Sequence, residues 1–196
     1  MEHKLILLGG GGHCKACIDV IEQEGKYEII GILDENNMVG QKVLGYEIFG
    51  RDNDIERLVK DGFHFLITVG QIKTSKLRQK LFDTLVRHGA VIASITSPRA
   101  YVSKHAYIDV GTIIMHDVLV NAGTKIGKNC IVNTKALLEH DVTIENHSHI
   151  STAAVVNGGV IVRKGTFFGS NAVSKEYVST DSEDFIKAGS IFKGVD

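Results

Sequence analysis

The chain has 196 residues, of which 43% are hydrophobic, and a formal net charge of −1 at pH 7. These values indicate an ordinary globular protein with room for one large or two small domains, and they give no bulk attraction to nucleic acid or to a membrane surface. The apolar run before residue 9 fits neither a signal peptide nor a membrane span of about 20 residues. We therefore expect a cytoplasmic protein without nucleic-acid partners and without insertion into a membrane.

Two predicted elements enclose a run of four glycines. Residues 4–8 form an apolar run typical of a buried strand, and residues 13–24 have apolar side chains at helical spacing. A glycine loop lets the backbone approach a phosphate, and the amides of the following helix N-terminus favour an anion. We expect an anion-binding loop here, with a purely structural turn as the alternative. The apolar stripe of the helix consists of Ala16, Ile18, Val20 and Ile21.

Cysteines are few and scattered along the chain. Cys14 and Cys17 form a C-x-x-C at the start of the predicted helix, where a lowered thiol pKa would allow a redox or metal role. The context of a thioredoxin-like motif is missing, and small side chains that pack a helix against a sheet would look the same. We expect packing rather than redox chemistry for this pair.

The α/β pattern continues to about residue 92. A second strand ends at Asp34, residues 64–70 form another, and residues 75–89 repeat a helical pattern that stops at Gly89. Strand, glycine turn, helix, strand and acidic residue together indicate half of a doubly wound fold. The apolar face of the later helix consists of Leu77, Leu81 and Leu85.

The glycine loop matches a dinucleotide fingerprint only in part. Gly9 and Gly11 fit the first two glycines of G-x-G-x-x-G, but Cys14 occupies the third position. A dinucleotide site also needs two βαβαβ halves, whereas only one is present. The sequence therefore favours a nucleotide half-site over a redox-cofactor site.

A period of six residues begins at residue 100. Each repeat has a small or β-branched residue followed two positions later by an apolar one, which is typical of a parallel β-helix with 18 residues in each triangular coil. The first set is Ala100, Ala106, Thr112, Val118, Thr124, Cys130, Ala136, Val142, Ser148, Ala154, Val160, Thr166 and Ala172. The second set is Val102, Ile108, Ile114, Val120, Ile126, Val132, Leu138, Ile144, Ile150, Val156, Val162 and Phe168. We expect the pattern to be lost after Ala172.

His140 is the candidate catalytic residue of the repeats. It lies outside the inward positions, and one coil later the same face presents Gly158, so a slot opens beside the imidazole. A slot of this kind suits a thin thioester arm. Glu139 and Asp141 flank the histidine, and a carboxylate on one ring nitrogen makes the other nitrogen a better base.

The other histidines of the repeats are interpreted differently. His149 lies half a coil after His140 and should face another side of the triangle, from which it would reach the His140 of a neighbour in a cyclic trimer. His105, His116 and His147 are expected to be solvated on the faces of the prism.

The second half, and its hexad KIGKNC at 125–130 in particular, resembles the left-handed β-helix acyltransferases. The whole chain resembles bacterial sugar acetyltransferases that join a Rossmann-like domain to such a helix, with UDP-4-amino-sugar N-acetyltransferases (PglD-like) and sialic acid O-acetyltransferases (NeuD-like) among them. The motif Glu139-His140-Asp141, followed by His149, is similar to that of the N-acetyltransferases. The expected fold is thus an α/β Rossmann-like domain at 1–92 and a left-handed parallel β-helix at 93–196.

The resemblance also implies ligands and roles. It assigns His140 as general base, with Asp141 as its carboxylate helper, for direct transfer from acetyl-CoA to the 4-amino group of a UDP-linked sugar, in a homotrimer and without a metal. The implied acetyl-CoA contacts are Asn133, His149 and Gly158. The implied contacts to the nucleotide sugar are Gly9, Gly10, Gly11, Gly12, His13 and Asp34.

Other functions remain open at this point. A sialic acid O-acetyltransferase would use the same fold and thioester chemistry, and a non-enzymatic nucleotide-sugar-binding trimer would share the loop. A zinc enzyme of the γ carbonic anhydrase type needs histidines that converge from stacked coils, yet no two histidines are 18 or 36 residues apart. The sequence does not identify the amino sugar or the glycan that receives it.

Overall fold

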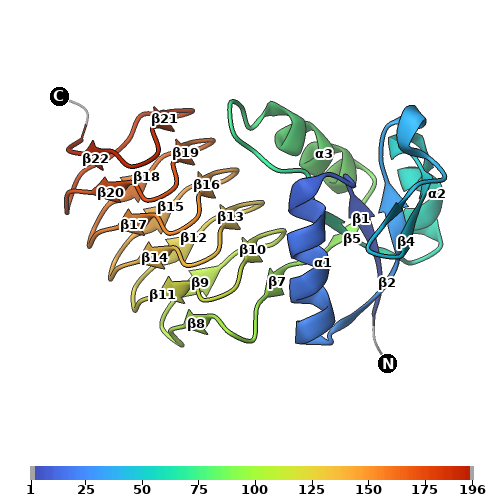
Figure 1. The fold of residues 1–196 in the computed structure, drawn as a ribbon, viewed down its shortest axis with the longest axis horizontal. Helices are drawn as coiled ribbons and strands as arrows, with labels where there is room; N and C mark the ends of the chain where they lie inside the picture. The colour runs from blue at the N-terminus through green and yellow to red at the C-terminus, as the bar shows by residue number, and fades with distance from the viewer. Residues whose placement is uncertain (1–2, 195–196) are drawn as a thin grey trace.

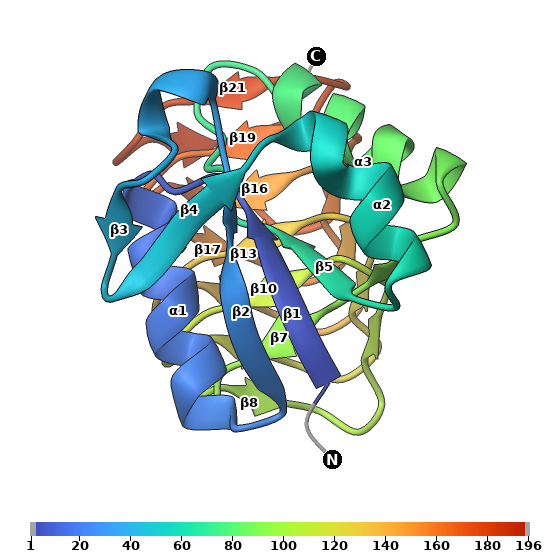
Figure 2. The same cartoon turned by 90° about the vertical axis from the view of Figure 1, so that its right-hand side faces the viewer.

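The computed structural model describes residues 3–194, and its first part is a six-stranded sheet (Figures 1 and 2). The strand order is β3-β4-β2-β1-β5-β6, and every pair is parallel except β3 with β4. The strands are β1 (His3–Leu8), β2 (Tyr27–Leu33), β3 (Lys42–Val43), β4 (Tyr46–Gly50), β5 (His64–Ile67) and β6 (Val91–Ile92). The helices are α1 (Gly12–Glu24), α2 (Ile55–Lys60), α3 (Lys76–Arg87) and the short 3-10 turns η1 (Asn36–Met38) and η2 (Asp52–Asp54). None of the helices in this described range has the length and apolarity that crossing a membrane requires.

The central strand β1 is buried on both faces, as its continuous apolar run predicts. Leu5 and Leu7 pack in the cluster that contains α1, whereas Ile6 packs with α2 and α3 on the other face. The predicted strands and helices are confirmed, with two corrections to their buried faces. Ala16 is exposed because Cys14, Cys17 and their neighbours fill the buried side of α1, and Leu77 is 51% exposed at the start of α3.

The second part is a prism of two-residue parallel strands in three sheets (Figure 1). Strands pair with those 18 residues away, as Ile113 does with Ile131. The first sheet contains β7 (Ile95–Thr96), β10 (Ile113–Ile114), β13 (Ile131–Val132), β16 (His149–Ile150), β19 (Phe167–Phe168) and β21 (Phe185–Ile186). The second contains β8 (Tyr101–Val102), β11 (Leu119–Val120), β14 (Leu137–Leu138), β17 (Val155–Val156), β20 (Val173–Ser174) and β22 (Ile191–Phe192). The third contains β9 (Tyr107–Ile108), β12 (Lys125–Ile126), β15 (Thr143–Ile144) and β18 (Ile161–Val162).

Both repeating sets of the sequence point into the prism and are buried, apart from the first two members of each set, which are partly buried. The predicted fold class, an α/β Rossmann-like domain followed by a left-handed parallel β-helix, is confirmed. The expectation that the repeat ends after Ala172 is wrong, because the coils continue to β22. Two inward positions there are polar and hide the pattern. Their hydroxyls satisfy backbone amides of the preceding coil: Ser174 Oγ accepts from Asn157 N at 2.8 Å, and Thr180 Oγ1 accepts from Arg163 N at 2.9 Å.

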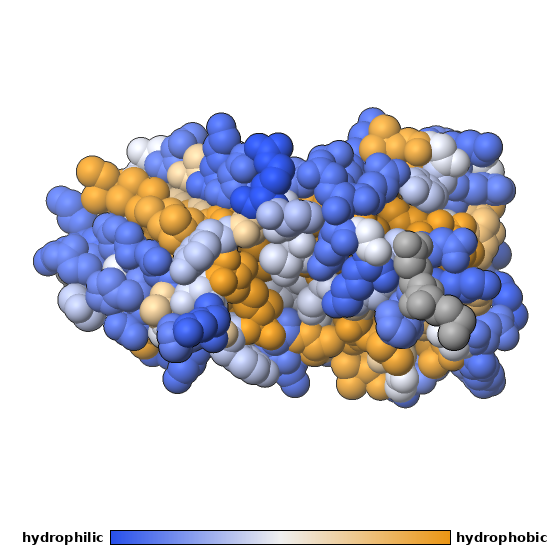
Figure 3. All heavy atoms as spheres, turned by 90° about the horizontal axis from the view of Figure 1, so that it is seen from below, coloured by the Kyte–Doolittle hydropathy of each residue, from blue (hydrophilic) through white to orange (hydrophobic). Residues whose placement is uncertain are grey.

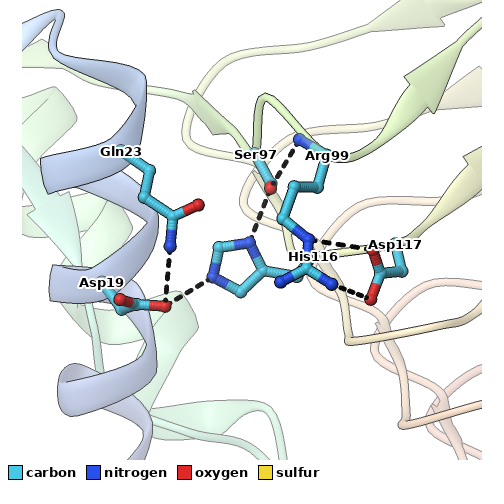
Figure 4. Close-up of polar contacts among 6 residues, drawn as sticks. All are labelled: Asp19, Gln23, Ser97, Arg99, His116 and Asp117. Atoms are coloured by element: carbon cyan, nitrogen blue, oxygen red, sulfur yellow. Dashed lines mark hydrogen bonds and ion pairs between the residues drawn. The ribbon is translucent and has the colours of Figure 1, made fainter.

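The α/β domain lies against the first sheet of the β-helix, and polar groups cross the seam (Figures 1 and 4). His116 Nε2 donates to Asp19 of α1 at 2.7 Å, while its Nδ1 lies 2.7 Å from Ser97 Oγ in the β-helix (Figure 4). The fully buried Arg78 of α3 donates to the carbonyl of Val69 at 2.6 Å and to Asn129 Oδ1 at 2.7 Å. These bonds join α1, α3 and the segment after β5 to the coils of the β-helix.

Candidate active site

The first two glycines of the loop are required by close packing. Gly9 has φ +101°, and a Cβ there would collide with Val69. A Cβ on Gly10 would lie 2.9 Å from Ile48 Cδ1, and the Gly10 amide donates to Asp34 Oδ2 at 2.5 Å. This part of the loop therefore has a structural role, and it holds Asp34 beside the end of β1.

The next two glycines face open space. Gly11 is the N-cap of α1, and nothing lies within 4 Å of a Cβ built on Gly11 or Gly12. Within residues 3–194, the amides of Gly11, Gly12 and His13 donate to no protein acceptor. Free amides at the positive end of a 13-residue helix form an anion-binding position.

A pocket of about 320 Å³ opens between this loop and α3. A second hollow of about 420 Å³ shares part of its lining, including Asp52 and Lys80. Leu33, Val69, Leu77 and Leu81 give the first pocket an apolar wall, and the polar lining consists of Asp34, Glu35, Arg51, Asp52, Asn53 and Lys80. Gly9 also lines the pocket, and the sequence analysis assigned only Gly9 and Asp34 to a nucleotide site. The other lining residues come from the ends of β2, β4 and β5 and from α3, and they share no local motif.

Two histidines and an asparagine meet under the glycine loop. His149 Nδ1 donates to the Gln71 carbonyl at 2.6 Å, and its Nε2 accepts from Asn133 Nδ2 at 3.2 Å. The His13 ring centroid lies 6.5 Å from that of His149. Burial, reinforced by the Arg78 charge, lowers the pKa of His13 to about 3 and that of His149 to about 4. Both imidazoles are therefore neutral near pH 7, and the buried His13 Nε2 has no hydrogen-bond partner in the described part of the chain.

His140 occupies the corner between β14 and β15, where its side chain is 56% exposed. Its Nδ1 lies 3.0 Å from Asp141 Oδ2, and an ionised carboxylate can only accept, so Nδ1 carries the proton and Nε2 is free to take one. A Cβ built on Gly158 would lie 2.6 Å from Nε2 and 2.7 Å from Cε1. Glu139, in contrast, accepts from Asn121 Nδ2 at 2.8 Å and does not contact the histidine.

His140 and His149 lie on different sides of the prism, as expected. His149 lies on the first sheet beneath the α/β domain, and Asn133 follows β13 at the corner between the first and second sheets. His140 follows β14 at the corner between the second and third sheets. One chain therefore does not bring His140 and His149 together.

The remaining histidines correct part of the sequence analysis. His105 is exposed, as expected. His116 bridges to α1, and His147 is only 7% exposed, accepts from Asn129 Nδ2 at 2.9 Å and has its pKa lowered to about 4 by burial. The expectation of solvated side chains was wrong for these two because α1 and α3 cover the face on which they lie.

All three thiols are buried. Burial raises the pKa of Cys14 and of Cys130 to about 11, and it raises the pKa of Cys17 still further above its usual range. The packing interpretation of Cys14 and Cys17 is confirmed by their place in the core between α1 and the sheet.

The chain is similar to several known proteins. Residues 4–85 match the family model described as the PglD N-terminal domain. The chain is 25% identical over 177 residues to a GDP-perosamine N-acetyltransferase of Escherichia coli O157:H7, covering 88% of this chain and 78% of that relative. A His-to-Asn variant of perosamine N-acetyltransferase from Caulobacter crescentus, solved with CoA and GDP-perosamine, is 28% identical with a TM-score of 0.91, covering 97% and 89% of the two chains. The acetyltransferase domain of PglB from Neisseria gonorrhoeae, solved with acetyl coenzyme A, is 25% identical with a TM-score of 0.87, covering 99% and 95%.

Proposed function

We propose that this chain, a homologue of the sugar N-acetyltransferases of the PglD/NeuD-like group, transfers the acetyl group of acetyl-CoA to the 4-amino group of a sugar linked to a nucleoside diphosphate. The observation that carries the proposal is the exposed His140–Asp141 pair, whose imidazole packs closely against Gly158 of the next coil. Relatives that bind CoA with an amino-sugar nucleotide, or acetyl coenzyme A, support both substrates.

His140 acts as the general base. Only a neutral amine attacks the thioester, so a proton must leave the nitrogen as it bonds to the carbonyl carbon. Asp141 holds the proton of the imidazole on Nδ1, and Nε2 accepts the proton of the amine. A positioned base of this kind contributes about 10²–10⁴-fold to the rate.

The acetyl group passes directly from coenzyme A to the amine. Gly158 lets the His140 ring lie close against the backbone of the next coil, and binding both substrates at once replaces a covalent relay. The buried Cys130, with its pKa raised to about 11, is unsuited to act as a nucleophile. Cys130→Ala should therefore retain activity.

The acceptor nucleotide occupies the α/β domain. Its diphosphate lies at the free amides of Gly11 and Gly12, and its nucleoside extends into the pocket beside Asp34. The neutral cluster of His13, His149 and Asn133 lies next to the loop, where the acetyl group and the sugar amine meet. The sequence led us to expect UDP, whereas one relative is named for GDP-perosamine and another was solved in complex with it.

A homotrimer completes the site, and the second sheet of the β-helix supports this assembly. Its outward side chains form an unbroken apolar ladder, and seen from below the β-helix carries a band of apolar side chains (Figure 3). The α/β domain covers the first sheet, and Lys125 and Thr143 make the third sheet more polar. The ladder consists of Tyr101, Leu119, Leu137, Val155, Val173 and Ile191.

The corners that border this ladder are the two that carry site residues. Asn133 lies at one corner of the second sheet and His140 at the other. Packing these sheets around a threefold axis brings the His140 corner of one chain to the Asn133 and His149 corner of the next. Each of the three sites then takes its base from one subunit and its nucleotide loop from another.

The test is a transfer assay with defined acceptors. The protein is incubated with acetyl-CoA and with UDP- and GDP-linked 4-amino-4,6-dideoxy sugars or free sialic acid, and thiol release is followed. We expect turnover with an amino-sugar nucleotide, its loss in His140→Ala and its retention in the control His105→Ala. Turnover with sialic acid alone would indicate an O-acetyltransferase, and stoichiometric nucleotide-sugar binding without thiol release would indicate a binding protein.

A further inference from the structure

Asp52 is an exposed residue whose carboxylate lines the proposed nucleotide pocket and has no partner among the described residues. It follows β4 in η2 and lines both the pocket of about 320 Å³ and the adjoining hollow of about 420 Å³. Across residues 3–194 no hydrogen bond or ion pair reaches its side chain. Its neighbour Asp54, in contrast, accepts from the Arg51 amide at 2.9 Å. Asp52 therefore has all its acceptor capacity available for a ligand.

The surroundings of Asp52 favour a ligand with several donors. Partial burial, with the charges of Asp34 and Glu35, raises the pKa of the Asp52 carboxyl, and the Lys80 ammonium opposes this shift. A carboxylate in this environment gains more from hydrogen-bond donors than a fully solvated one. The apolar walls formed by Leu77 and Leu81 leave space for a flat ring beside it.

The order of strands sets which part of the nucleotide reaches Asp52. The free amides lie after β1, Asp34 lies after β2, and Asp52 lies after β4, and these three strands are neighbours in that order. Adjacent strands are roughly 4.8 Å apart, so Asp52 lies roughly 10 Å along the sheet edge from the phosphate position. With the diphosphate at α1 and the ribose at Asp34, the base extends to Asp52.

We propose that the base is guanine and that Asp52 reads it by accepting the N1–H and the N2 amine together; this inference rests on the nucleotide-sugar function proposed above. Guanine presents two adjacent donors that match the two oxygens of one carboxylate. Uracil presents a single N3–H between two carbonyl oxygens, which a carboxylate repels. Adenine presents one donor next to an acceptor nitrogen and is matched by only one of the two oxygens.

The first measurement is nucleotide binding by the full chain without acetyl-CoA. GDP should bind at least about 10-fold more tightly than UDP or ADP, because a site built for two donors rejects a ligand that leaves a carboxylate unpaired. Inosine diphosphate lacks the N2 amine and should bind more weakly than GDP. Tighter binding of UDP than of GDP overturns the proposal.

The second measurement exchanges the base that is recognised. Asp52→Asn presents one acceptor and one donor, which match the N1–H and the C2 carbonyl of xanthine. The variant should lose at least about 10-fold in GDP affinity, leave UDP affinity unchanged and bind xanthosine diphosphate more tightly than GDP. The matched control is Asp61→Asn, an exposed carboxylate paired with Arg57 at the end of α2, which should leave GDP affinity unchanged.

These results distinguish recognition of the nucleobase by Asp52 from the acetyltransferase activity. Selective GDP binding that depends on Asp52, without acetyl transfer to any amino sugar, would support this inference and refute the proposed function. Transfer to a UDP-amino sugar, with equal effects of Asp52→Asn on UDP and GDP, would do the reverse. Absence of binding by any nucleotide would overturn both.

Discussion

Gly158→Ala tests the close contact between Gly158 and His140, the proposed general base. The added Cβ would lie 2.6 Å from His140 Nε2, whereas ordinary van der Waals contact begins near 3.4 Å. The ring must therefore move by close to an ångström, and it can do so because the side chain is 56% exposed. An off-rotamer shift costs about 0.5–1.5 kcal/mol, so the variant should fold with a small change in Tm. A misplacement of about 1 Å at a reacting group costs about 10²-fold in rate.

The assay is steady-state thiol release together with thermal unfolding. Gly158→Ala should lower kcat/KM by about 10²-fold, because the added methyl group displaces the His140 ring. Gly127→Ala adds a methyl group at another corner, away from His140, where its Cβ would meet Asn146 Oδ1 and the Asn146 backbone nitrogen, so it should lower Tm more than Gly158→Ala but lose less activity. If Gly158→Ala retained wild-type kcat/KM, or if folded Gly127→Ala lost as much activity, the contact between Gly158 and His140 would have no part in catalysis.

The other predictions concern the base, the loop, the assembly and pH. His140→Ala should lower kcat/KM by about 10²-fold or more, and Asp141→Asn should cost less, because it perturbs the base without removing it; an acetylated protein on rapid quench would contradict direct transfer. Gly11→Val fills the open space at α1 and should raise the acceptor KM more than the acetyl-CoA KM, and equal effects would make the loop structural. Leu137→Glu, at the centre of the apolar ladder, should convert a trimer into monomers in light scattering, and a monomeric wild type would exclude the shared site. Burial lowers the pKa of His149 from 6.5 to about 4, so the unfolded chain binds more protons over this range, and Tm should fall as pH decreases from 6.5 to 4, with a weaker dependence in His149→Gln.

The sequence predicts the β-helix well because small, β-branched and apolar residues mark the inward positions of each coil. A two-residue strand has one inward side chain, so a period of six in the sequence is already a description of the core. The prediction failed at Ser174 and Thr180, where the inward residue is a hydroxyl that bonds a backbone amide of the preceding coil. Hydropathy does not distinguish such a satisfied hydroxyl from a surface residue.

The site was predicted only where its parts lie close together in the sequence. His140 and Asp141 are adjacent, and Gly158 is one coil away, so the repeat period alone brings them together. Arg51 and Lys80 line the nucleotide pocket from separate elements, and no local spacing connects them. The burial of His147 was missed for the same reason, since it depends on α3 packing against a face that the hexads alone leave open.

The buried Arg78 connects the α/β domain to the β-helix. It is 1% exposed, and no ion pair to it is found within the described residues. Its two terminal nitrogens donate to carbonyl oxygens at the end of β5 and to Asn129 of the β-helix, whereas its buried Nε has no hydrogen-bond partner in that range. Burial lowers its pKa only to about 10, so it remains charged near pH 7. A buried charge of this kind is costly unless its donors are paired, and its partners come from both halves of the chain. Burial is the main cause of the lowered pKa of His13 and of His149 beside the glycine loop, and the Arg78 charge adds to it. The residue that joins α3 and the end of β5 to the β-helix thus also favours the neutral form of the two imidazoles between them.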